Sequence, residues 1–440
     1  MGGVGVFPWK AFPEATGSTT PRPMAGMDPG EGRVIARILA TGDELVGGAK
    51  VDTNSAWLAG ELSRGRGIAV DRIELCGDGV EENVRALRGL AGEGVLLLVT
   101  GGLGPTGDDR TREAVARVAG VELVEDRAGR ERLRARLAGR GIPWSPSQGR
   151  QVLHPAGFTP LPNPVGQALG FQGVLAGAET FVLPGVPVEL KAMFREEVLP
   201  RLPRGADQVL VELTAAGVPE AVIGERLASL LERPEPVLGM TAEGGVVVIR
   251  IRARGPGAVA RAEAAAGEVE RLLGPRLAGR GRLALHQVVG RLLVERGITL
   301  ATAESCTGGW LAGRLVSFPG ISRVFRGGVV AYADQAKTEW VGVPSELILR
   351  EGAVSEAVAR ALAEGAAGRT GARLGIGVTG IAGPGGAVAG KPVGTVYLAL
   401  CLDGDCRVQR FTFQGDRDEV RRSTVRTALR LVLERVREVF

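Results

Sequence analysis

The chain has 440 residues, of which 45% are hydrophobic and 23% are charged, a balance that is typical of folded globular proteins. This composition excludes a chain that is disordered throughout, a collagen-like protein and a coiled coil. The formal net charge is only +5 and aromatic residues make up 4% of the chain, so there is no strong nucleic-acid signal. The longest apolar runs, such as residues 95–99, are far shorter than the roughly 20 residues that cross a bilayer.

The cysteines and the N-terminal segment favour a location inside the cell. The four cysteines have neither the spacing of a paired metal site nor the density of a disulfide scaffold, so we expect reduced thiols and a cytoplasmic location. They are Cys76, Cys306, Cys401 and Cys406. Residues 1–33 are rich in Gly, Pro, Ser and Thr and lack the apolar core of a secretory signal. We predict a disordered tail there, with Met24 or Met27 as the native start.

From residue 34 to residue 203, short apolar runs alternate with helical stretches. We predict strands over residues 34–40, 68–75 and 95–100, and helices after Thr53, from Glu81, over 127–140 and from Val188. The segment between the last two helices is rich in Pro and Gly, and we predict loops there up to Pro187. This order is the βαβ rhythm of a parallel α/β sheet, and it defines a first domain over residues 34–203.

Residues 204–280 change in character and predict a small α+β module. Strand 209–215, helix 219–231, a second strand, the Gly244-Gly245 turn, strand 246–253 and an alanine-rich helix follow one another in βαββα order. A third domain over residues 284–440 begins with a helix at 285–296 and ends with a helix that has one apolar face. The predicted fold class is therefore α/β, with two α/β domains of mainly parallel sheets joined by the small module.

A glycine-rich loop follows the most apolar strand of the first domain. Strand 95–100 runs into Gly101-Gly102-Leu103-Gly104-Pro105-Thr106-Gly107-Asp108-Asp109, after which a helix begins. Glycines at the carboxyl end of a parallel strand let backbone amides approach a phosphate, and carboxylates beside a phosphate usually hold a divalent metal ion. An ordinary turn with an aspartate cap is the alternative. Residues 41–44, 163–171 and 183–189 form further loops that could converge on the same place.

Together, these four loops resemble those of the N-terminal, molybdopterin-binding-like domain of the competence/damage-inducible CinA family, and the resemblance continues along the chain after the tail. It implies a metal-dependent pyrophosphatase that acts on ADP-ribose and related nucleotide diphosphates. By the same resemblance the metal is Mg²⁺, Mn²⁺ or Co²⁺, with K⁺ as a further candidate ion. The residues that it implies are Asp43, Asp78 and Asp109 for the metal, Gly102, Gly104 and Thr106 for the phosphates, and Asn54 for a substrate contact.

A second chemical motif lies in the third domain. Strand 298–303 ends in Glu304-Ser305-Cys306-Thr307-Gly308-Gly309, and a helix begins directly after it. A hydroxyl on such a sharp turn is presented above the sheet, where amides at the helix start can stabilise an oxyanion. Ser305 is the preferred nucleophile, since a free cysteine is commonly buried and Thr307 lies at a capping position, but all three side chains remain candidates. An ordinary helix cap with a buried cysteine is the alternative.

Lysine is rare in this chain, with only five among 54 basic residues. Lys337 and Lys391 both lie in loops beside predicted strand ends. A lysine desolvated between a sheet and a loop can act as the base for a serine, whereas an arginine keeps its proton. Surface solubility is the alternative for both lysines, and it is the stronger one for Lys391, which lies in a glycine-rich loop.

These segments resemble the C-terminal domain of the same family, the nicotinamide-nucleotide amidase. The resemblance implies deamidation of nicotinamide mononucleotide to nicotinate mononucleotide and ammonia, without a cofactor. Ser305 would attack the carboxamide, and Lys337 and Tyr332 would move the proton. The substrate would be lined by Thr307, Gly308, Thr379 and Gly380. The chain departs from the usual family residues at Ala333, Asp334 and Gly385, where Ser, Asn and Asp are frequent.

The resemblance implies a bifunctional hydrolase of pyridine-nucleotide salvage whose partners are small nucleotides. A non-catalytic molybdopterin- or nucleotide-binding protein with a role in DNA uptake or competence is the alternative. The middle module resembles a KH-like fold, yet it has no basic Gly-x-x-Gly loop between its first helix and second strand, so RNA clamping is not supported. We expect this module to help form a homodimer.

Overall fold

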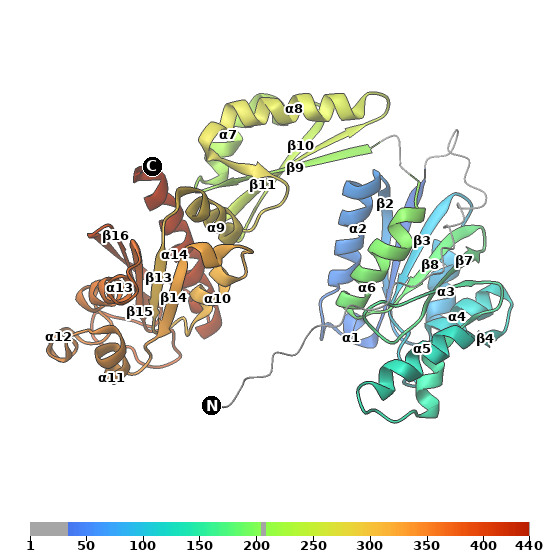
Figure 1. Ribbon diagram of the computed structural model, residues 1–440. Helices are drawn as coiled ribbons and strands as arrows, with labels where there is room; N and C mark the ends of the chain where they lie inside the picture. The colour runs from blue at the N-terminus through green and yellow to red at the C-terminus, as the bar shows by residue number, and fades with distance from the viewer. Residues whose placement is uncertain (1–33, 204–207, 440) are drawn as a thin grey trace, which may run out of the picture. The chain divides into compact units, whose positions relative to one another are not determined.

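The computed structural model describes residues 34–203 and 208–439 (Figure 1). The predicted tail over residues 1–33, with Met24 and Met27, lies outside the described residues. Contacts within the chain divide it into two compact units, Met1–Gln208 and Val209–Phe440. The predicted end of the first domain, at residue 203, lies close to this division.

The first unit contains a six-stranded sheet in the order β2-β1-β3-β8-β7-β6. Its parallel strands are β2 (Ala69–Cys76), β1 (Ile35–Thr41), β3 (Val95–Thr100) and β8 (Ala178–Leu183). Strands β7 (Gly170–Leu175) and β6 (Thr159–Leu161) extend the sheet in antiparallel pairing. The three strands predicted before residue 101 are confirmed, but the prediction of loops up to Pro187 is wrong, because β6, β7 and β8 lie in that segment.

Helices cover both faces of this sheet. All six residues of β3 are buried, and they alternate between two cores: Leu97 and Val99 pack on one side, and Leu96 and Leu98 on the other. The helices of this unit are α2 (Thr53–Arg66), α3 (Val80–Leu90), α4 (Thr111–Ala119), α5 (Arg127–Ala138) and α6 (Pro187–Met193). Its short elements are α1 (Asp43–Val46), β4 (Leu123–Glu125) and β5 (Leu153–Pro155). Strand β3 is thus buried on both faces of the sheet, and the loop that follows its carboxyl end carries part of the predicted site.

The second unit begins with the small α+β module, whose sheet has the order β10-β11-β9-β12. Its elements are β9 (Gln208–Ala216), α7 (Glu220–Leu231), β10 (Val237–Glu243), β11 (Val246–Arg254), α8 (Ala258–Leu273) and β12 (Leu277–Arg280). The predicted βαββα order is confirmed, and β12 adds a short antiparallel strand at the edge next to β9. Gly244 and Gly245 have φ angles of 54° and 89° and form the predicted turn between β10 and β11.

The rest of this unit is built on a five-stranded sheet in the order β14-β13-β15-β16-β17. Strands β14 (Phe325–Val330), β13 (Leu300–Glu304) and β15 (Leu374–Gly380) are parallel, and β16 (Thr395–Leu402) and β17 (Asp405–Thr412) continue it in antiparallel pairing. The helices are α9 (Leu285–Arg296), α10 (Trp310–Val316), α11 (Asp334–Ala336), α12 (Ser345–Glu351), α13 (Glu356–Thr370) and α14 (Arg417–Val439). The α/β class with mainly parallel sheets in both larger domains is therefore confirmed.

Two cores hold this sheet between its helices. Leu300 packs with residues of α9, α10 and α14, whereas Ala301 and Ala303 face a core that contains residues of α12 and α13. Ala216 and Val246 of the small module belong to the first of these cores, so the module and the sheet share buried apolar surface. This placement leaves the carboxyl ends of β13 and β15 at one edge of the sheet.

The cysteines differ from the expectation of four reduced thiols. Cys401 and Cys406 form a disulfide, because the β16–β17 hairpin pairs the two residues directly, while Cys76 and Cys306 are free.

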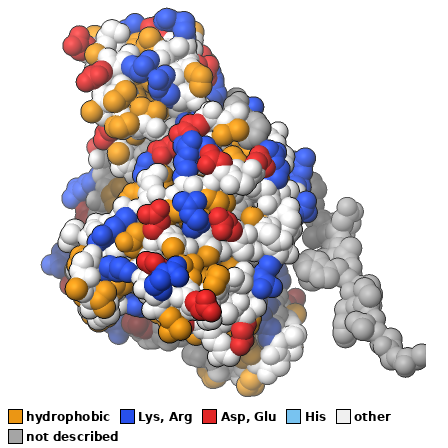
Figure 2. Space-filling model, turned by 90° about the vertical axis from the view of Figure 1, so that its left-hand side faces the viewer, with side chains coloured by type: hydrophobic (Ala, Val, Ile, Leu, Met, Phe, Trp, Pro, Cys, Tyr) orange, Lys and Arg blue, Asp and Glu red, His pale blue; other side chains and the backbone are white. Residues whose placement is uncertain are grey.

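Figure 2 shows one face of the molecule, on which Lys and Arg alternate with Asp and Glu, without a continuous basic patch on that face. Within the described part of the chain, no helix combines the length and the apolar character needed to span a membrane.

Candidate functional site

The carboxyl ends of the parallel strands of the first unit border a large cavity. Its volume is about 820 Å³, and its wall includes Thr41 at the end of β1, Asp78 after β2, Thr100 at the end of β3 and Pro184 after β8. Of the residues predicted for this site, Asn54, Asp78, Gly102, Gly104 and Asp109 line the cavity. The structure therefore brings the four loops of the sequence motif to one place, as expected for the crevice outside the strand ends of an α/β sheet.

Two positions of the glycine-rich loop have no room for a side chain. A Cβ atom at Gly102, which has a φ of 63°, would lie 2.1 Å from Thr111 Oγ1, and one at Gly104 would lie 2.3 Å from Asp109 Oδ2. Arg112 is 1% exposed and lies beneath the loop, where it donates hydrogen bonds to the carbonyls of Leu103 and Gly104. Burial lowers the pKa of Arg112 to about 10. This cation, which sequence reasoning missed, adds positive charge behind the loop.

The three predicted metal ligands are only partly gathered. Asp43 and Asp78 exchange hydrogen bonds of 3.0 Å, each from its backbone N–H to the carboxylate of the other. Asp109 Oδ2 instead accepts from Thr106 N at 2.9 Å and Thr106 Oγ1 at 2.5 Å, so the donors of Thr106 are directed to Asp109. Within residues 34–203, the three carboxylates do not lie within 4.8 Å of one another.

The charges around Asp78 nevertheless fit a cation. Burial raises the pKa of Asp78, and the negative charges of Asp43, Glu44 and Asp108 raise it further, against the hydrogen bond from the backbone of Asp43. Carboxylate oxygens that repel one another beside an open cavity are the hard donors that Mg²⁺ or Mn²⁺ prefers. Asp78 is therefore suited to bind a cation, whereas Asp43 is not among the residues of the cavity wall and Asp109 is held by Thr106.

Two buried amide side chains face this cavity with unsatisfied oxygens. Asn54 Nδ2 donates to Gly185 O at 2.8 Å and to Thr100 Oγ1 at 3.3 Å, which fixes the orientation of the amide and leaves Oδ1 without a partner. Gln151, which is 5% exposed, lines the same cavity and has an unpartnered Oε1. Buried oxygens of this kind are acceptors for a ligand donor or a cation. Gln151 was missed because it lies in a segment predicted as a loop without a motif.

The serine motif of the second unit forms a tight turn between β13 and α10. Ser305 is 8% exposed, and its backbone N–H donates to Val378 O of the neighbouring β15 at 2.9 Å. The carboxylate of Glu304, which is 1% exposed, accepts hydrogen bonds from the amides of Gly309, Leu311 and Ala312 at 3.1, 3.1 and 2.8 Å. Glu304 thus ties the end of the strand to the start of the helix and shapes the turn that carries Ser305.

Among the three candidate nucleophiles, the environment favours Ser305. Burial raises the pKa of the Cys306 thiol to about 12, so this thiol stays protonated at neutral pH. Thr307 is fully buried, and its Oγ1 has no hydrogen-bond partner. The amides of Cys306 and Thr307 donate to no backbone carbonyl of the described chain.

Lys337 lies in a buried position beside the serine turn. Ala331, directly after β14, donates its amide hydrogen to the carbonyl of the residue before Ser305 at 2.8 Å. Lys337 is 2% exposed, and its Nζ donates to Tyr332 O at 2.9 Å and to Asp334 Oδ1 at 3.1 Å. The Lys337 amine therefore binds the residue that follows Ala331, and Ala331 makes the contact between the two strand ends. No hydrogen bond in the described chain joins it to the Ser305 hydroxyl, so proton transfer between them requires a bridging water or a side-chain movement.

Two arginines of α14, which sequence reasoning missed, lie at the same edge of the sheet. Arg417 donates to the hydroxyl of Tyr332 at 2.7 Å and to Gly383 O at 2.8 Å. Arg421 donates to Thr307 O at 3.2 Å, and its guanidinium carbon lies 3.5 Å from the ring centroid of Trp310. Their spacing of four residues places both on one face of the helix, which was the signal available in the sequence.

The remaining predicted residues of this site are mainly structural in the absence of substrate. Thr379 is 1% exposed and donates its hydroxyl to Ala353 O at 2.7 Å. A Cβ atom at Gly380 would lie 2.7 Å from Val396 Cγ2, so this position is restricted to glycine. Lys391 donates to Glu351 O at the end of α12 at 3.1 Å, which favours a capping role for this second lysine.

Comparison with known proteins divides the chain at similar points. Residues 37–204 match the family model described as "Probable molybdopterin binding domain", and residues 282–436 match the "CinA C-terminal domain". A CinA-like protein of Geobacter sp. (strain M21) is 44% identical over 400 residues, which cover 89% of this chain and 95% of the relative. One of Myxococcus xanthus (strain DK1622) is 41% identical over 396 residues, with coverage of 87% and 94%. The crystal structure of a CinA superfamily protein from Klebsiella pneumoniae is 37% identical and covers 35% of this chain and 96% of its own, with a TM-score of 0.34.

Proposed function

Since the chain belongs to the CinA family of competence/damage-inducible proteins, with a molybdopterin-binding-like domain and a CinA C-terminal domain, we propose that its serine turn is an amidase site that deamidates nicotinamide mononucleotide. One observation supports the proposal: Ser305 lies on a strand-to-helix turn, and Lys337, which is 2% exposed, donates to the carbonyl of the residue after Ala331, whose amide contacts the carbonyl before Ser305. A hydroxyl, a neighbouring amine and unpaired amides are the parts that acyl transfer requires.

In the first half of the reaction, Ser305 Oγ attacks the carboxamide carbon and Lys337 accepts the serine proton. The oxygen of the tetrahedral intermediate becomes negative and accepts hydrogen bonds from the amides of Cys306 and Thr307. Collapse of the intermediate breaks the C–N bond, and the ammonium of Lys337 returns the proton to the leaving ammonia. An ester between Ser305 and the nicotinate group remains.

Water then hydrolyses this ester, with water in the place of the attacking serine and the serine oxygen in the place of the leaving nitrogen. Lys337 accepts a proton from water, the hydroxide attacks the ester carbon, and the serine oxygen leaves with the proton that the lysine returns. Tyr332 assists by position, because its carbonyl holds Lys337 Nζ and its hydroxyl accepts a hydrogen bond from Arg417. Arg417 and Arg421 supply positive charge for the phosphate of a mononucleotide, which supports a nucleotide rather than a free amide as the substrate.

We propose further that the cavity of the first unit hydrolyses ADP-ribose or a related nucleotide diphosphate. Gly102 and Gly104 would present the backbone to the phosphates above Arg112, and Asn54 Oδ1 would accept a hydrogen bond from the nucleoside. The cation would be held by Asp78, Asp43 and Asp109. A bound divalent ion would neutralise charge on the diphosphate and lower the barrier to attack by water.

The test is an assay of both reactions on the full chain and its variants. Ser305→Ala and Lys337→Ala should each lower ammonia release from nicotinamide mononucleotide by at least about 1,000-fold, because nucleophile and base act as a unit. Asp109→Ala should leave ammonia release intact and remove cleavage of ADP-ribose in Mg²⁺, Mn²⁺ or Co²⁺. Ser317→Ala, which changes another serine of the same domain, is the matched control and should retain both activities. Crossed outcomes, with Asp109→Ala losing ammonia release, would overturn the assignment of two sites.

The cavity of the first unit also fits a second function, since its unpartnered Asn54 and Gln151 oxygens would serve a bound pterin or nucleotide without turnover. Tight binding of ADP-ribose with no product in any of the three metals would favour this non-catalytic alternative. Binding of DNA that weakens with salt would favour a role in DNA uptake.

A further inference from the structure

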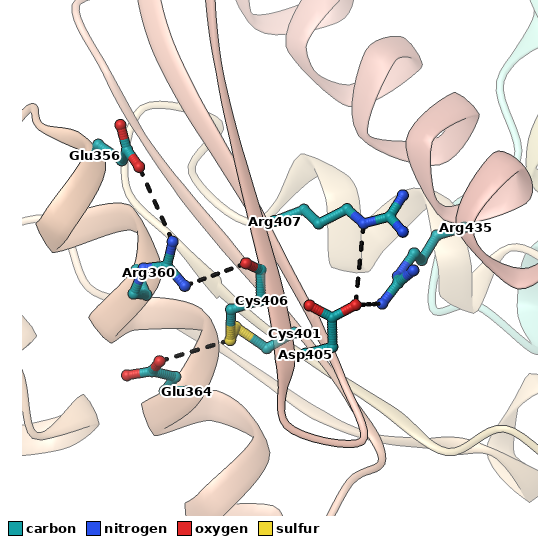
Figure 3. Close-up of a disulfide and its surroundings, with 8 residues drawn as sticks. All are labelled: Glu356, Arg360, Glu364, Cys401, Asp405, Cys406, Arg407 and Arg435. Carbon is teal, nitrogen blue, oxygen red and sulfur yellow. Dashed lines mark hydrogen bonds and ion pairs between the residues drawn. A yellow bond between two sulfur atoms is a disulfide. The ribbon is translucent and has the colours of Figure 1, made fainter. Parts of the chain in front are cut away.

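The disulfide lies in a hairpin that holds its two sulfurs together independently of the S–S bond. Cys401 and Cys406 face each other across β16 and β17, which pair over eight residue pairs (Figure 3). The turn residues Asp403 and Gly404 have φ angles of 49° and 87°, and the hairpin closes one residue pair beyond the cysteines. The pair that closes a two-residue turn is hydrogen-bonded, and hydrogen-bonded and non-hydrogen-bonded pairs alternate along the ladder. The cysteines, one pair further from the turn, therefore form a non-hydrogen-bonded pair, where side chains stand closest. Their thiols therefore remain neighbours after reduction.

A third ligand reaches the cysteines from α13. Ala359 and Ala363 of this helix pack with Cys401, which is 3% exposed, and their small side chains let the helix approach the sheet. Glu364 Oε1 lies 3.5 Å from Cys406 Sγ, as Figure 3 shows. The ligand atoms of Cys401, Cys406 and Glu364 all lie within 4.8 Å of one another, the one group of three such ligands found so close together in residues 34–203 and 208–439.

We propose that reduction of this disulfide opens a binding site for a thiophilic divalent cation, represented by Zn²⁺, with the thiolates of Cys401 and Cys406 and the carboxylate of Glu364 as ligands. Two sulfurs and one oxygen are a donor set that zinc accepts in tetrahedral geometry, with water as the fourth ligand. Tetrahedral zinc bonds of about 2.0 to 2.3 Å place ligand atoms roughly 3.5 Å apart, which is near the 3.5 Å between Glu364 Oε1 and Cys406 Sγ, while the two sulfurs move apart once their bond is reduced. Glu364 is exposed and Cys406 is half-buried, so the water position faces solvent.

The two steps balance in electrons and protons. A dithiol reductant gives two electrons and two protons to the disulfide, which breaks into two thiols while the reductant becomes a disulfide. Zn²⁺ then displaces the two thiol protons and binds the thiolates. Arg360 lies beside the pair, with Nη1 donating to Cys406 O at 3.1 Å. In the oxidised state the sulfurs are bonded to each other, so the site is closed.

This site is separate from the serine turn. Cys401 pairs with Gly375 near the start of β15, whereas Gly380, at the end that carries the serine site, pairs with Val396. These two residue pairs are five steps apart along the strands, which is about 17 Å at about 3.4 Å per residue. The proposal therefore does not rest on the amidase or pyrophosphatase assignments, and metal binding itself is the readout.

The experiment titrates Co²⁺ and Zn²⁺ into the full chain, oxidised or reduced with a phosphine, without oxygen. Thiolate ligands give Co²⁺ a sulfur-to-metal charge-transfer band, which the oxygen ligands of the first unit cannot produce. The reduced chain should show this band at one Co²⁺ per chain, displaced by Zn²⁺, and the oxidised chain should lack it. Free-thiol counts in denaturant should be two before reduction and four after it, since two of the four cysteines are bonded.

Variants identify the ligands. Cys401→Ser and Cys406→Ser should remove the band, and Glu364→Gln should weaken binding about tenfold or more. Cys76→Ser and Glu346→Gln are matched controls that should bind as the parent chain does. The proposal is overturned if the fully reduced chain shows no band, if Cys406→Ser keeps it, or if the chain as isolated in air already has four free thiols.

Discussion

Glu304 is the residue whose change tests the architecture of the serine turn most sharply. Its Oε2 accepts hydrogen bonds from the amides of Gly309 and Leu311, and its Oε1 accepts one from Ala312. In Glu304→Gln, the single amide oxygen can replace only one of these carboxylate oxygens. If this oxygen keeps the two bonds at the Oε2 position, the NH₂ group of the glutamine faces the N–H of Ala312. Neither of these two donors then has the acceptor that Oε1 of the glutamate supplied.

Each buried donor without an acceptor costs about 1 to 3 kcal/mol, and the Thr302 hydroxyl, 3.4 Å from Oε1, can rotate to accept from the new amide. One donor, the amide of Ala312, then remains without an acceptor, so we expect the free energy of unfolding to fall by about 1 to 3 kcal/mol. At about 2 to 4 °C per kcal/mol for a domain of this size, the Tm falls by about 2 to 12 °C. A displaced serine turn should also lower kcat/KM for deamidation by about 100-fold.

The assay combines thermal unfolding followed by circular dichroism with hydrogen exchange at the amides of the turn. Glu304→Gln should speed exchange at Ala312 more than at Leu311, because the Gln oxygen preserves the second bond. Glu346→Gln, which changes an exposed carboxylate of α12, is the control and should alter stability by less than about 0.5 kcal/mol. A Glu304→Gln protein that melts with the parent and protects the Ala312 amide equally would show that these hydrogen bonds do not hold the serine turn.

Three further predictions follow from the environments of single residues. Cys306→Ala should lower ammonia release by less than about tenfold, since a thiol with a pKa of about 12 is not the nucleophile; a loss as large as that of Ser305→Ala would contradict this. The raised pKa of Asp78 costs stability above its unfolded pKa of about 3.9, so Asp78→Asn should stabilise the metal-free protein at pH 7 by less than about 1 kcal/mol, and urea unfolding at pH 4 should show most of this gain gone. Arg112→Met leaves two loop carbonyls without a donor and should cost about 2 to 4 kcal/mol and most ADP-ribose cleavage, whereas the same change at exposed Arg127 should leave both near the parent values.

The regular elements could be predicted because burial pattern and end signals agree. Strand 95–100 is apolar along its length and ends at Gly101, whose φ of 107° few other residues adopt. The helix over 285–296 ends at Gly297, which has a left-handed φ of 61°. Where pattern and terminator coincide, the predicted bounds match the structure within one or two residues.

The strands between residues 153 and 183 could not be predicted for identifiable reasons. Pro155 and Pro160 lie within β5 and β6, although proline normally argues against a strand. The turn between β7 and β8 places Ala176 at a φ of 47°, where Asn, Asp or Gly would have been the usual signal. Pairing of β5 with β4, of β6 with β7 and of β7 with β8 outweighs local propensity in this segment.

Part of each candidate site could be predicted from the sequence, and part could not. Asp78, Gly102 and Ser305 follow parallel strands, and parallel strands bring their carboxyl ends to one edge. Arg112 and Gln151 reach the first cavity only through the packing of a helix and a loop, so no local pattern indicates their role. The contact between Lys337 and the carbonyl of Tyr332 depends in the same way on a turn that folds back after β14.

The proposed amidase reaction begins when the hydroxyl of Ser305 attacks the carboxamide of nicotinamide mononucleotide. Acid quenching during turnover, followed by peptide mapping in a mass spectrometer, measures this directly. We expect the peptide containing Ser305 to gain the mass of the nicotinate mononucleotide acyl group, ammonia to appear in an initial burst equal to the enzyme concentration, and Lys337→Ala to abolish both. Turnover with no adduct and no burst, or an adduct on a peptide without Ser305, would contradict it.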